Sequence, residues 1–342
     1  MYPYVMQTML PTVDGESQAA LQVLYGWTPQ QRLDDRGTTD RATLGVTFQD
    51  TFIPQPPIVM PRMVWKGVVG DYGIYESDFV NGNWTSGRQI PNIGSSHSPA
   101  LADFSTLHPG PCFIMAWKGN TGDQALYWSR DPGDGWDPHQ IIPDAGSSTR
   151  PALANVAGTI YMACKGVDGD NGIYWSKFNW SNSDGTGWWD PFTLIPGIGT
   201  SDSPAIVGVD KKLFMFWKGI DDDHNAYWSV FDFKNDPIWR PQRRIEYFSY
   251  VTEGGVPLAI GTTGGLTATQ RGNNILIACK GIEGDSQIYV LLFDITKYEF
   301  SGPIIVPNVG TSVGPSVVQA NTQTLMAWKG TEDDHTIWWS QL

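Results

Sequence analysis

The chain has 342 residues, of which 13% are aromatic and only 17% are charged, with 38 glycines and 24 prolines. This balance is typical of short strands joined by tight turns and indicates an all-β fold. The formal net charge of −13 argues against binding to nucleic acid or to an anionic membrane surface, because both carry negative charge themselves.

Residues 1–26 form an N-terminal segment in which the sequence pattern defines no element. The segment lacks the basic start and the continuous apolar core of a signal peptide. No stretch of the chain is long and apolar enough to predict a transmembrane helix. We therefore expect a soluble protein without membrane insertion or a classical secretion signal, either cytoplasmic or secreted by a non-classical route.

A short motif recurs six times after this segment. It reads Trp-Lys-Gly or Cys-Lys-Gly, and an aspartate follows the lysine five residues later, before an apolar-aromatic pair such as Ile-Tyr. The six copies begin at Trp65, Trp117, Cys164, Trp217, Cys279 and Trp328. Such regular recurrence indicates one repeated structural unit.

The second unit displays the strands of the repeat most clearly. Turn residues divide its roughly 50 residues into four strand-like runs, PALADF, CFIMAWKG, QALYWSR and WDPHQIIP. Four strands in a unit of this length are typical of a propeller blade, since solenoid repeats of similar length are helical. Apolar residues fall on both faces of the central runs, as expected when each blade is packed between two others. We predict a six-bladed β-propeller with four antiparallel strands per blade.

The two ends of the chain predict how the ring closes. The last unit stops at Ser340, after its third strand, while Trp27–Leu33 aligns with the outer run Trp136–Ile142 of the second unit. Residues 27–37 are therefore expected to supply the outer strand of the last blade, which removes two open sheet edges. Residues 38–342 would form blades one to six of a single domain, with the inner strand of blade one starting at about Thr38.

One interval between copies of the motif is longer than the others. It lies between Trp217 and Cys279, and the extra residues fall near Glu246 to Thr252, before an expected inner strand at 256–259. Long loops carry function more often than short ones. A functional loop and a tolerated surface insertion are both consistent with this pattern.

The repeated turns predict a ligand-binding rim. They share one rim of the propeller with segments such as Gly-Ser-Ser 94–96, which lead into the next blade. Hydroxyls, carboxylates and ammonium groups beside aromatic rings suit sugars, whose hydroxyls need hydrogen-bond partners and whose ring faces stack on aromatic side chains. The predicted ligand-binding residues are Lys66, Asp71, Lys118, Asp123, Trp128, Lys165, Asp170, Trp175, Lys218, Asp223, Trp228, Lys280, Asp285, Lys329, Asp334 and Trp339.

Structural roles for these residues stay open beside the binding role. The aspartates could cap backbone amides in tight turns and pair with the lysines. The tryptophans, which follow the third-strand tyrosine, could pack between blades. Glu76 and Val290 replace this tryptophan in blades one and five, so stacking on a ligand at this position would leave four competent pockets.

The corner Ser129–Trp136 has the pattern Ser-x-Asp-x-Gly-x-x-Trp and resembles the Asp-box of sialidases and other propellers. This resemblance implies a fold-stabilising turn away from any active site. A sialidase-like enzyme would need three arginines and a tyrosine nucleophile with a glutamate partner. Arg41, Arg62 and Arg150 are candidate arginines, but no tyrosine and glutamate stand out as such a pair.

Neither the cysteines nor the histidines have the spacing of metal ligands. The chain has three cysteines, which cannot all be paired within it. The Asp-Asp-His triplets that end at His224 and His335 are unsuited to convergent ligation. No metal and no cofactor are therefore expected.

The overall pattern, from about Trp27 onward, resembles the propeller lectins of fungi and bacteria, such as the tectonin-like and fucose-lectin-like proteins. That resemblance implies monosaccharide pockets between neighbouring blades. Several equivalent weak pockets gain avidity, whereas a single-site enzyme gains nothing from repetition. We expect a multivalent lectin for neutral sugars, with glycans or glycoproteins as partners and self-association left open. The alternatives are a sialidase-like glycoside hydrolase with one central site and a non-enzymatic protein-interaction propeller.

Overall fold

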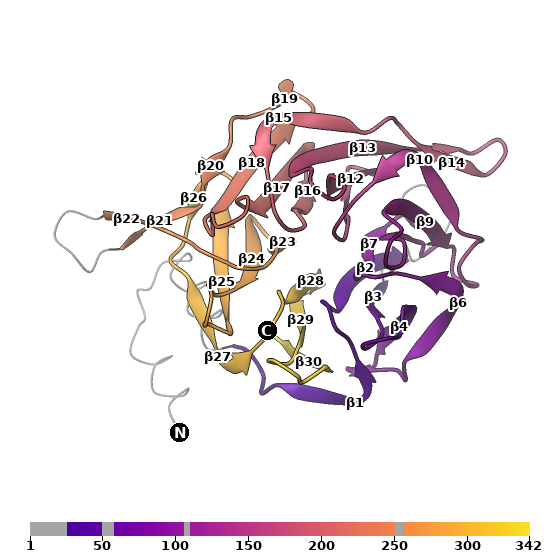
Figure 1. The fold of residues 1–342 in the computed structure, drawn as a ribbon, viewed down its shortest axis with the longest axis horizontal. Helices are drawn as coiled ribbons and strands as arrows, with labels where there is room; N and C mark the ends of the chain where they lie inside the picture. The colour runs from indigo at the N-terminus through magenta and orange to yellow at the C-terminus, as the bar shows by residue number, and fades with distance from the viewer. Residues whose placement is uncertain (1–25, 50–57, 106–109, 250–255) are drawn as a thin grey trace.

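The computed structural model describes residues 26–49, 58–105, 110–249 and 256–342. Within these ranges the chain consists of β-strands and turns, and none of them contains a helix long and apolar enough to cross a membrane. Six sheets of four or five strands are arranged around a central axis, and a seventh sheet has two strands (Figure 1). The predicted six-bladed β-propeller is confirmed.

Each blade runs from an inner strand at the axis to an outer strand at the rim, with antiparallel pairing throughout. Blade one contains β2 (Thr43–Gln49), β3 (Ile58–Lys66), β4 (Gly73–Val80), β5 (Asn83–Trp84) and β6 (Arg88–Gly94). Blade two contains β7 (Ala100–Asp103), β8 (Phe113–Lys118), β9 (Ala125–Asp131) and β10 (Gln140–Gly146). Blade three contains β11 (Ala152–Val156), β12 (Thr159–Lys165), β13 (Gly172–Ser181), β14 (Thr186–Trp189) and β15 (Thr193–Gly199).

Blade four contains β16 (Ala205–Val209), β17 (Lys212–Lys218), β18 (Ala226–Asp232), β19 (Asp236–Trp239) and β20 (Arg243–Arg244), and it carries the hairpin β21 (Glu246–Ser249) and β22 (Val256–Ala259). Blade five contains β23 (Thr267–Arg271), β24 (Asn274–Lys280), β25 (Gln287–Asp294), β26 (Glu299–Phe300) and β27 (Ile304–Gly310). Blade six contains β28 (Ser316–Ala320), β29 (Gln323–Lys329), β30 (Thr336–Gln341) and β1 (Gln31–Gly37).

The ring closes through the first strand of the chain, as predicted. β1 pairs antiparallel with β30, in a register that sets Arg32 opposite Trp338. The backbone N–H of Thr28 also donates to the carbonyl of Gln341, at 2.9 Å. The inner strand β2 begins at Thr43 rather than at about Thr38, because the intervening residues cross from the rim to the axis. Residues 1–25 of the predicted N-terminal segment lie outside the described residues.

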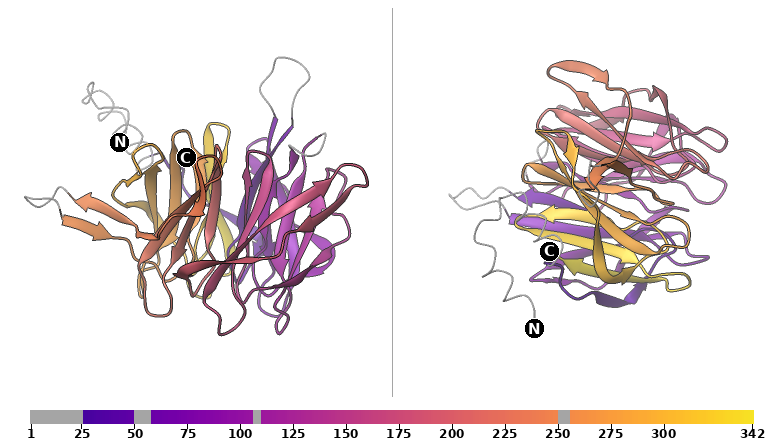
Figure 2. Two further views of the ribbon diagram at one scale, coloured as in Figure 1. Left: turned by 90° about the horizontal axis from the view of Figure 1, so that it is seen from above. Right: turned by 90° about the vertical axis from the view of Figure 1, so that its left-hand side faces the viewer.

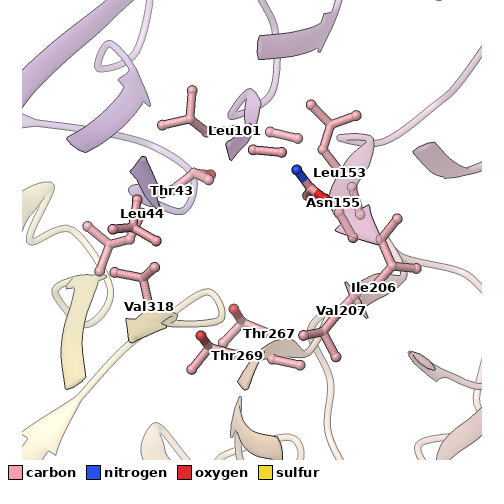
Figure 3. Close-up of a pocket in the computed structure, with 18 of the residues that line it drawn as sticks. Thr43, Leu44, Leu101, Leu153, Asn155, Ile206, Val207, Thr267, Thr269 and Val318 are labelled. Atoms are coloured by element: carbon pink, nitrogen blue, oxygen red, sulfur yellow. The ribbon is translucent and has the colours of Figure 1, made fainter. Parts of the chain in front are cut away.

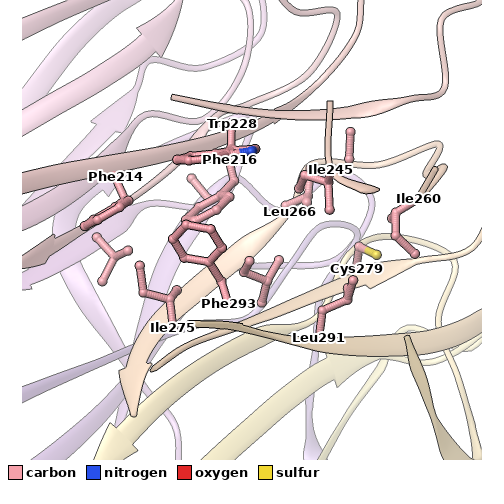
Figure 4. Close-up of a cluster of buried hydrophobic side chains, with 14 of the residues drawn as sticks. Phe214, Phe216, Trp228, Ile245, Ile260, Leu266, Ile275, Cys279, Leu291 and Phe293 are labelled. Carbon is pink, nitrogen blue, oxygen red and sulfur yellow. The ribbon is translucent and has the colours of Figure 1, made fainter. Parts of the chain in front are cut away.

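The hydrophobic core is divided among the six interfaces between blades. Each of six clusters of buried apolar side chains draws its members mainly from two neighbouring blades. Between blades four and five, for example, Phe214, Phe216 and Trp228 contact Phe293 (Figure 4). Each large aromatic side chain buries on the order of 150–250 Å² in such an interface. This packing explains why apolar residues occupy both faces of the central strands.

The expected inner strand at Val256–Ala259 is wrong. These residues form β22, which pairs with β21, and the inner strand of blade five is β23. The hairpin interrupts the outer strand of blade four between Ile245 and Ile260, both of which bond to Ala226. Other outer strands carry an irregularity in register at the equivalent place, so the insertion expands a site where pairing is already broken. Figures 1 and 2 show β21 and β22 projecting outward from the ring.

Candidate functional site

The repeated aspartates organise the turns between the second and third strands. Asp123 accepts the backbone N–H of Ala125 through Oδ1 (2.9 Å) and the hydroxyl of Tyr127 through Oδ2 (2.9 Å). The same pair of bonds recurs in every blade, with the indole N–H of Trp338 replacing the tyrosine hydroxyl in blade six. Both oxygens of each carboxylate therefore have partners within their own blade. The carboxylates act as acceptors that hold the turn and the third strand together.

The repeated lysines connect each blade to the segment that enters it. Lys118 Nζ donates to Ser96 Oγ (2.8 Å) and to the carbonyl of Asp123 (3.0 Å). The equivalent lysine–hydroxyl distances in the other blades are 2.6 Å for Lys66 and Thr39, 2.8 Å for Lys165 and Ser148, 2.7 Å for Lys218 and Ser201, 3.0 Å for Lys280 and Thr263, and 2.7 Å for Lys329 and Ser312. Burial lowers the pKa of Lys118. The lysines form a ring of ammonium groups held by hydroxyls and carbonyls, and their role in ligand binding stays a prediction.

The third-strand tryptophans pack against the next blade. Trp128 is 4% exposed, and its ring lies edge-on to Phe178 of blade three, with 4.8 Å between centroids. Trp175, Trp228 and Trp339 make similar contacts with Phe231, Phe293 and Phe79, at 4.8, 4.8 and 5.4 Å. Most of the surface of Trp128 is already in contact with protein. Stacking of these four rings on a ligand stays a prediction.

Blade one departs from this pattern at Glu76, and a cluster of charged side chains fills its interface with blade two. We call this cluster the polar wedge; its members are Arg62, Glu76, Asp78, Arg88, Asp131 and Trp136. Arg62 lies at the centre, with Nε 2.6 Å from Asp78 Oδ1, Nη1 3.3 Å from Glu76 Oε2, and Nη1 also in contact with Asp131. The indole N–H of Trp136 donates to Glu76 Oε2 at 3.0 Å. The guanidinium of Arg62 also lies 4.8 Å from the centroid of Phe113.

The polar wedge is buried on the inside and open on the outside. Arg62, Glu76 and Asp131 are buried, whereas the side chain of Arg88 is 57% exposed. Arg88 closes the open side, with Nε 2.8 Å from Glu76 Oε1 and Nη2 3.2 Å from Asp78 Oδ2. Although burial by itself would raise the pKa of Asp131, the hydrogen bond from Arg62 holds it below the usual value. Two arginines face three carboxylates, so the wedge carries a net charge of −1.

The sequence contained a signal for the polar wedge that motif analysis missed. The residue three positions before the Trp or Cys of the motif is apolar or aromatic in five units, namely Ile114, Tyr161, Phe214, Leu276 and Leu325. In blade one it is Arg62. A charged residue at a core position needs a charged partner nearby. Glu76, which replaces the third-strand tryptophan in the same blade, is such a partner.

Two arginines that entered the enzyme hypothesis lie on the axis. Arg41 Nη1 donates to the carbonyl of Leu266 (2.9 Å), and its other nitrogens contact the carbonyls of Gly265 and Gly314. Burial, and then repulsion from Arg150, lowers the pKa of Arg41 to about 9.

The second arginine, Arg150, lies between two carboxylates, 3.2 Å from Asp40 and 3.4 Å from Asp202. Asp40 and Asp202 also accept backbone N–H groups of Ser98 and Gly265. Asp40, Arg41, Arg150 and Asp202, here called the axial clasp, thereby touch the connecting segments of all six blades.

A funnel opens on one side of the axial clasp. It is a cavity of about 690 Å³ lined by the six inner strands. Figure 3 shows Leu44, Leu101, Leu153, Ile206 and Val318 around its central opening. Thr267, Thr269 and Asn155 supply a few polar groups. Arg41, Asp103, Arg150 and Gln319 also line the cavity, so its wall combines aliphatic and polar side chains.

Comparison with known proteins supports the fold. No protein-family model and no curated protein sequence matches the chain. Among solved structures, the chain is similar to the Aleuria aurantia lectin, described as a six-bladed propeller with a novel fucose recognition mode, with a TM-score of 0.58 and 11% identity over 91% of this chain and 93% of that one. It is also similar to AofleA from Arthrobotrys oligospora, with a TM-score of 0.58 and 9% identity over 92% of this chain and 86% of that one.

A third similar structure is the subtype N10 neuraminidase-like protein of A/little yellow-shouldered bat/Guatemala, with a TM-score of 0.55 and 12% identity over 93% of this chain and 98% of that one. The solved structures that resemble this chain therefore include a fungal propeller lectin and a neuraminidase-like protein. At these identities the likeness concerns the fold.

Proposed function

We propose that this protein binds carbohydrates, and that it holds neutral sugars in notches between blades. The observation that carries the proposal is the polar wedge between blades one and two. In four other blades a packed tryptophan fills the corresponding space between blades, whereas charged hydrogen-bonding groups occupy it here. The propeller lectins among the similar structures support the same class of function.

The wedge contains the groups that recognise a sugar. Glu76 and Asp78 each direct an oxygen toward Arg88, whose exposed side chain is the partner that a ligand can displace. Two hydroxyls of a sugar would replace the two N–H groups of Arg88. Arg62 and the indole N–H of Trp136 keep the carboxylates in place from behind. Charge-assisted hydrogen bonds of this kind are among the strongest that proteins make.

The charge of the site favours neutral ligands, and its buried carboxyl group Asp131 is unsuited to serve as the general acid of a hydrolase. A wedge with a net charge of −1 in a chain of net charge −13 repels anionic sugars. Glycoside hydrolysis usually requires one carboxyl group with a raised pKa, to serve as the general acid. In the wedge, Arg62 keeps the pKa of Asp131 below its usual value despite burial.

A glycan array followed by calorimetry tests the proposal. We expect binding of a neutral glycan such as an α-L-fucoside, with an affinity that falls about tenfold to a hundredfold in Glu76→Gln, because a hydrogen bond to a charged group contributes about 1.5–3 kcal/mol. Arg88→Ala should also change the affinity while the melting temperature stays nearly constant. The matched control is Arg240→Ala, which removes another exposed, ion-paired arginine, 53% exposed, far along the chain from the wedge.

The outcomes separate the candidate functions. Absence of binding to neutral glycans, or equal affinity in wild type and Glu76→Gln, would contradict the assignment to the wedge. Turnover of an aryl glycoside would favour the hydrolase alternative. A stoichiometry above one would extend the proposal to further notches, including those at the lysines, aspartates and tryptophans of the other blades.

A further inference from the structure

A second cavity lies on the axis, on the other side of the axial clasp from the funnel. It has a volume of about 380 Å³ and is lined by the segments that lead from one blade to the next. We call it the axial bowl. Its volume falls within the range of small-molecule sites, and it is separate from the polar wedge, with which it shares no lining residue.

The axial clasp forms the floor of the bowl. Asp40, Arg150 and Asp202 line the cavity, and Arg41 lies beside them, bonded to three carbonyls. The two positions opposite the arginines have room only for glycine, because a larger residue would collide with the guanidinium groups. A Cβ on Gly265 would lie 2.6 Å from Arg150 Nη2, and a Cβ on Gly314 would lie even closer to Arg41. Arg150 is thus paired with both aspartates, and Arg41 is held in place by backbone carbonyls.

Hydroxyl groups form the wall. Ser96, Ser201, Thr263 and Ser312 line the bowl, each accepts a lysine Nζ–H, and each donates its proton to a glycine carbonyl. A hydroxyl oxygen has two lone pairs, so Ser201, Thr263 and Ser312 each retain one acceptor position for a ligand, whereas Ser96 Oγ also lies 3.1 Å from His97 Nδ1. The lysine behind each hydroxyl polarises it and strengthens the bond that the hydroxyl donates to the glycine carbonyl, which fixes the direction of the hydroxyl oxygen.

The bowl is not six-fold symmetric. One side carries His97, Thr149 and Asp40, while the other side carries Gly264 and Val313. Within the described residues the hydroxyl of Thr149 is buried and has no hydrogen-bond partner. An unpaired buried polar group costs free energy, and rotation of the Thr149 side chain toward the bowl would let a ligand hydroxyl remove this cost. The cavity therefore has one polar wall and one wall of small, partly apolar residues. This difference would orient a single bound ligand in one way.

The positive charges around the bowl are matched by carboxylates, and further carboxylates give the surrounding turns an excess of negative charge. The six repeated lysines are matched by the six repeated aspartates, and the two arginines of the clasp by two aspartates. Burial lowers the pKa of His97, so this imidazole adds no charge at neutral pH. Exposed acidic residues occupy the tips of the surrounding turns at Asp168, Asp221, Asp222, Glu283, Glu332 and Asp333. A neutral ligand meets no electrostatic penalty here, whereas an anion would be repelled on approach.

We propose that the axial bowl is a second ligand site, which takes one neutral polyhydroxylated molecule of monosaccharide size. The ligand hydroxyls would bond to the lysine-held serine and threonine oxygens and to Thr149. Its carbon skeleton would lie toward Gly264 and Val313. This site does not depend on the proposed function of the polar wedge, and the two can be tested apart.

Site-specific blocking tests the proposal. Methyl α-L-fucoside, methyl β-D-galactoside and myo-inositol are titrated into the full-length protein by calorimetry and soaked into its crystals. Gly264→Phe should fill the bowl without strain at its attachment point, because φ lies outside the left-handed region and a Cβ would have its nearest neighbour at 3.6 Å. We expect Gly264→Phe to reduce the affinity of the axial site at least tenfold and Gly264→Ala to leave it within twofold.

Thr149→Val gives a second test that preserves shape. It removes the unpaired hydroxyl, so we expect about a tenfold loss of affinity with an unchanged or higher melting temperature. Glu76→Gln, which alters the polar wedge, should leave the axial site unaffected. If Gly264→Phe fails to fold, Val313→Trp provides an equivalent block from the neighbouring position on the same side of the bowl.

Three results would overturn the proposal. They are the absence of all three polyols from the axis in soaked crystals, affinities unchanged by both blocking variants, and preferential binding of sulfate or acetate in the bowl. Loss of axial binding in Gly264→Phe together with retained binding in Glu76→Gln would support it. The reverse pattern would place all sugar binding at the wedge.

Discussion

At the scale of single residues, the repeat places each polar group next to hydrogen-bond partners that are close to it in the sequence or in the segment that enters its blade. Asp123 bonds to an amide and a tyrosine two and four residues away, so the same turn forms in each blade from local sequence alone. Lys118 bonds to Ser96, which belongs to the preceding connection. A buried ammonium group without partners would be strongly unfavourable, so each lysine requires the segment that enters its blade to be in place.

Trp128 tests whether the third-strand tryptophans are packing residues. Trp128→Ala should lower the free energy of unfolding by about 3–5 kcal/mol, because it leaves a cavity beside Phe178 at a nearly fully buried position. Denaturant unfolding measures this change. Trp188→Ala is the control, since Trp188 is 51% exposed and its removal should cost less than about 1 kcal/mol. Unchanged stability of Trp128→Ala with lost sugar binding would instead support stacking on a ligand.

At the scale of elements, the contrast lies between the strand that closes the ring and the hairpin that leaves it. β1 pairs along β30 and contributes Leu33 to the cluster between blades six and one. β21 and β22 pair with each other and extend away from the ring (Figure 1). Removing β1 exposes the edge of a sheet, whereas removing the hairpin leaves all six blades with their pairing partners.

Deletion of residues 1–37 should therefore abolish the stable monomer. The exposed edge of β30 would favour unfolding or edge-to-edge association, which size-exclusion chromatography with light scattering and circular dichroism would detect. Replacement of residues 246–259 by two glycines is the control, and we expect it to stay monomeric with a melting temperature within a few degrees of wild type. A stable monomer without residues 1–37 would contradict closure through β1.

At the scale of the whole molecule, the axial clasp joins parts of the chain that are far apart in sequence. Asp40 contacts the connections that enter blades two and three, Arg41 those that enter blades five and six, and Asp202 those that enter blades three and five. Removing one partner of a buried ion pair lowers the free energy of unfolding, because the other charge is then left buried and unpaired. The clasp therefore requires the complete ring.

The acid stability of the protein should depend on this clasp. Burial by itself would raise the pKa of Asp40, but Arg150 and the backbone N–H groups of Ser98 and Arg41 lower it below 3.8, the value for an unfolded chain. A carboxyl with a depressed folded pKa contributes stability above the unfolded value and loses it as the pH falls through the folded value. The free energy of unfolding should thus be nearly constant near neutral pH and decrease below about pH 4, by ~1.4 kcal/mol per unit of pKa difference.

Urea unfolding at a series of pH values measures this dependence. Asp40→Asn should be less stable than wild type at pH 7 and should show a shallower decrease on acidification, because one of the titrating groups is gone. Equal slopes for the two proteins between pH 5 and pH 2 would show that Asp40 does not contribute to acid sensitivity.

The sequence by itself determined the number of blades, the strands within each blade and the closure by the N-terminal strand. These features follow from local patterns, such as the recurrence from Trp65 to Trp328 and the match of Trp27–Leu33 to an outer strand. Alternation, turn residues and repetition are properties of neighbouring residues, so no tertiary contact is needed to recognise them. The same local matching misplaced the inner strand of blade five, because Val256–Ala259 imitates its pattern inside an inserted hairpin.

Only the tertiary structure decided which polar residues meet. Arg62, Glu76 and Asp131 come from different strands and two different blades, and Arg41 meets carbonyls more than 200 residues away. Such meetings depend on the ring being closed and on the rotation that brings each blade against the next. A one-dimensional pattern cannot encode distances across that ring, so the polar wedge and the axial bowl emerge only when all six blades are assembled.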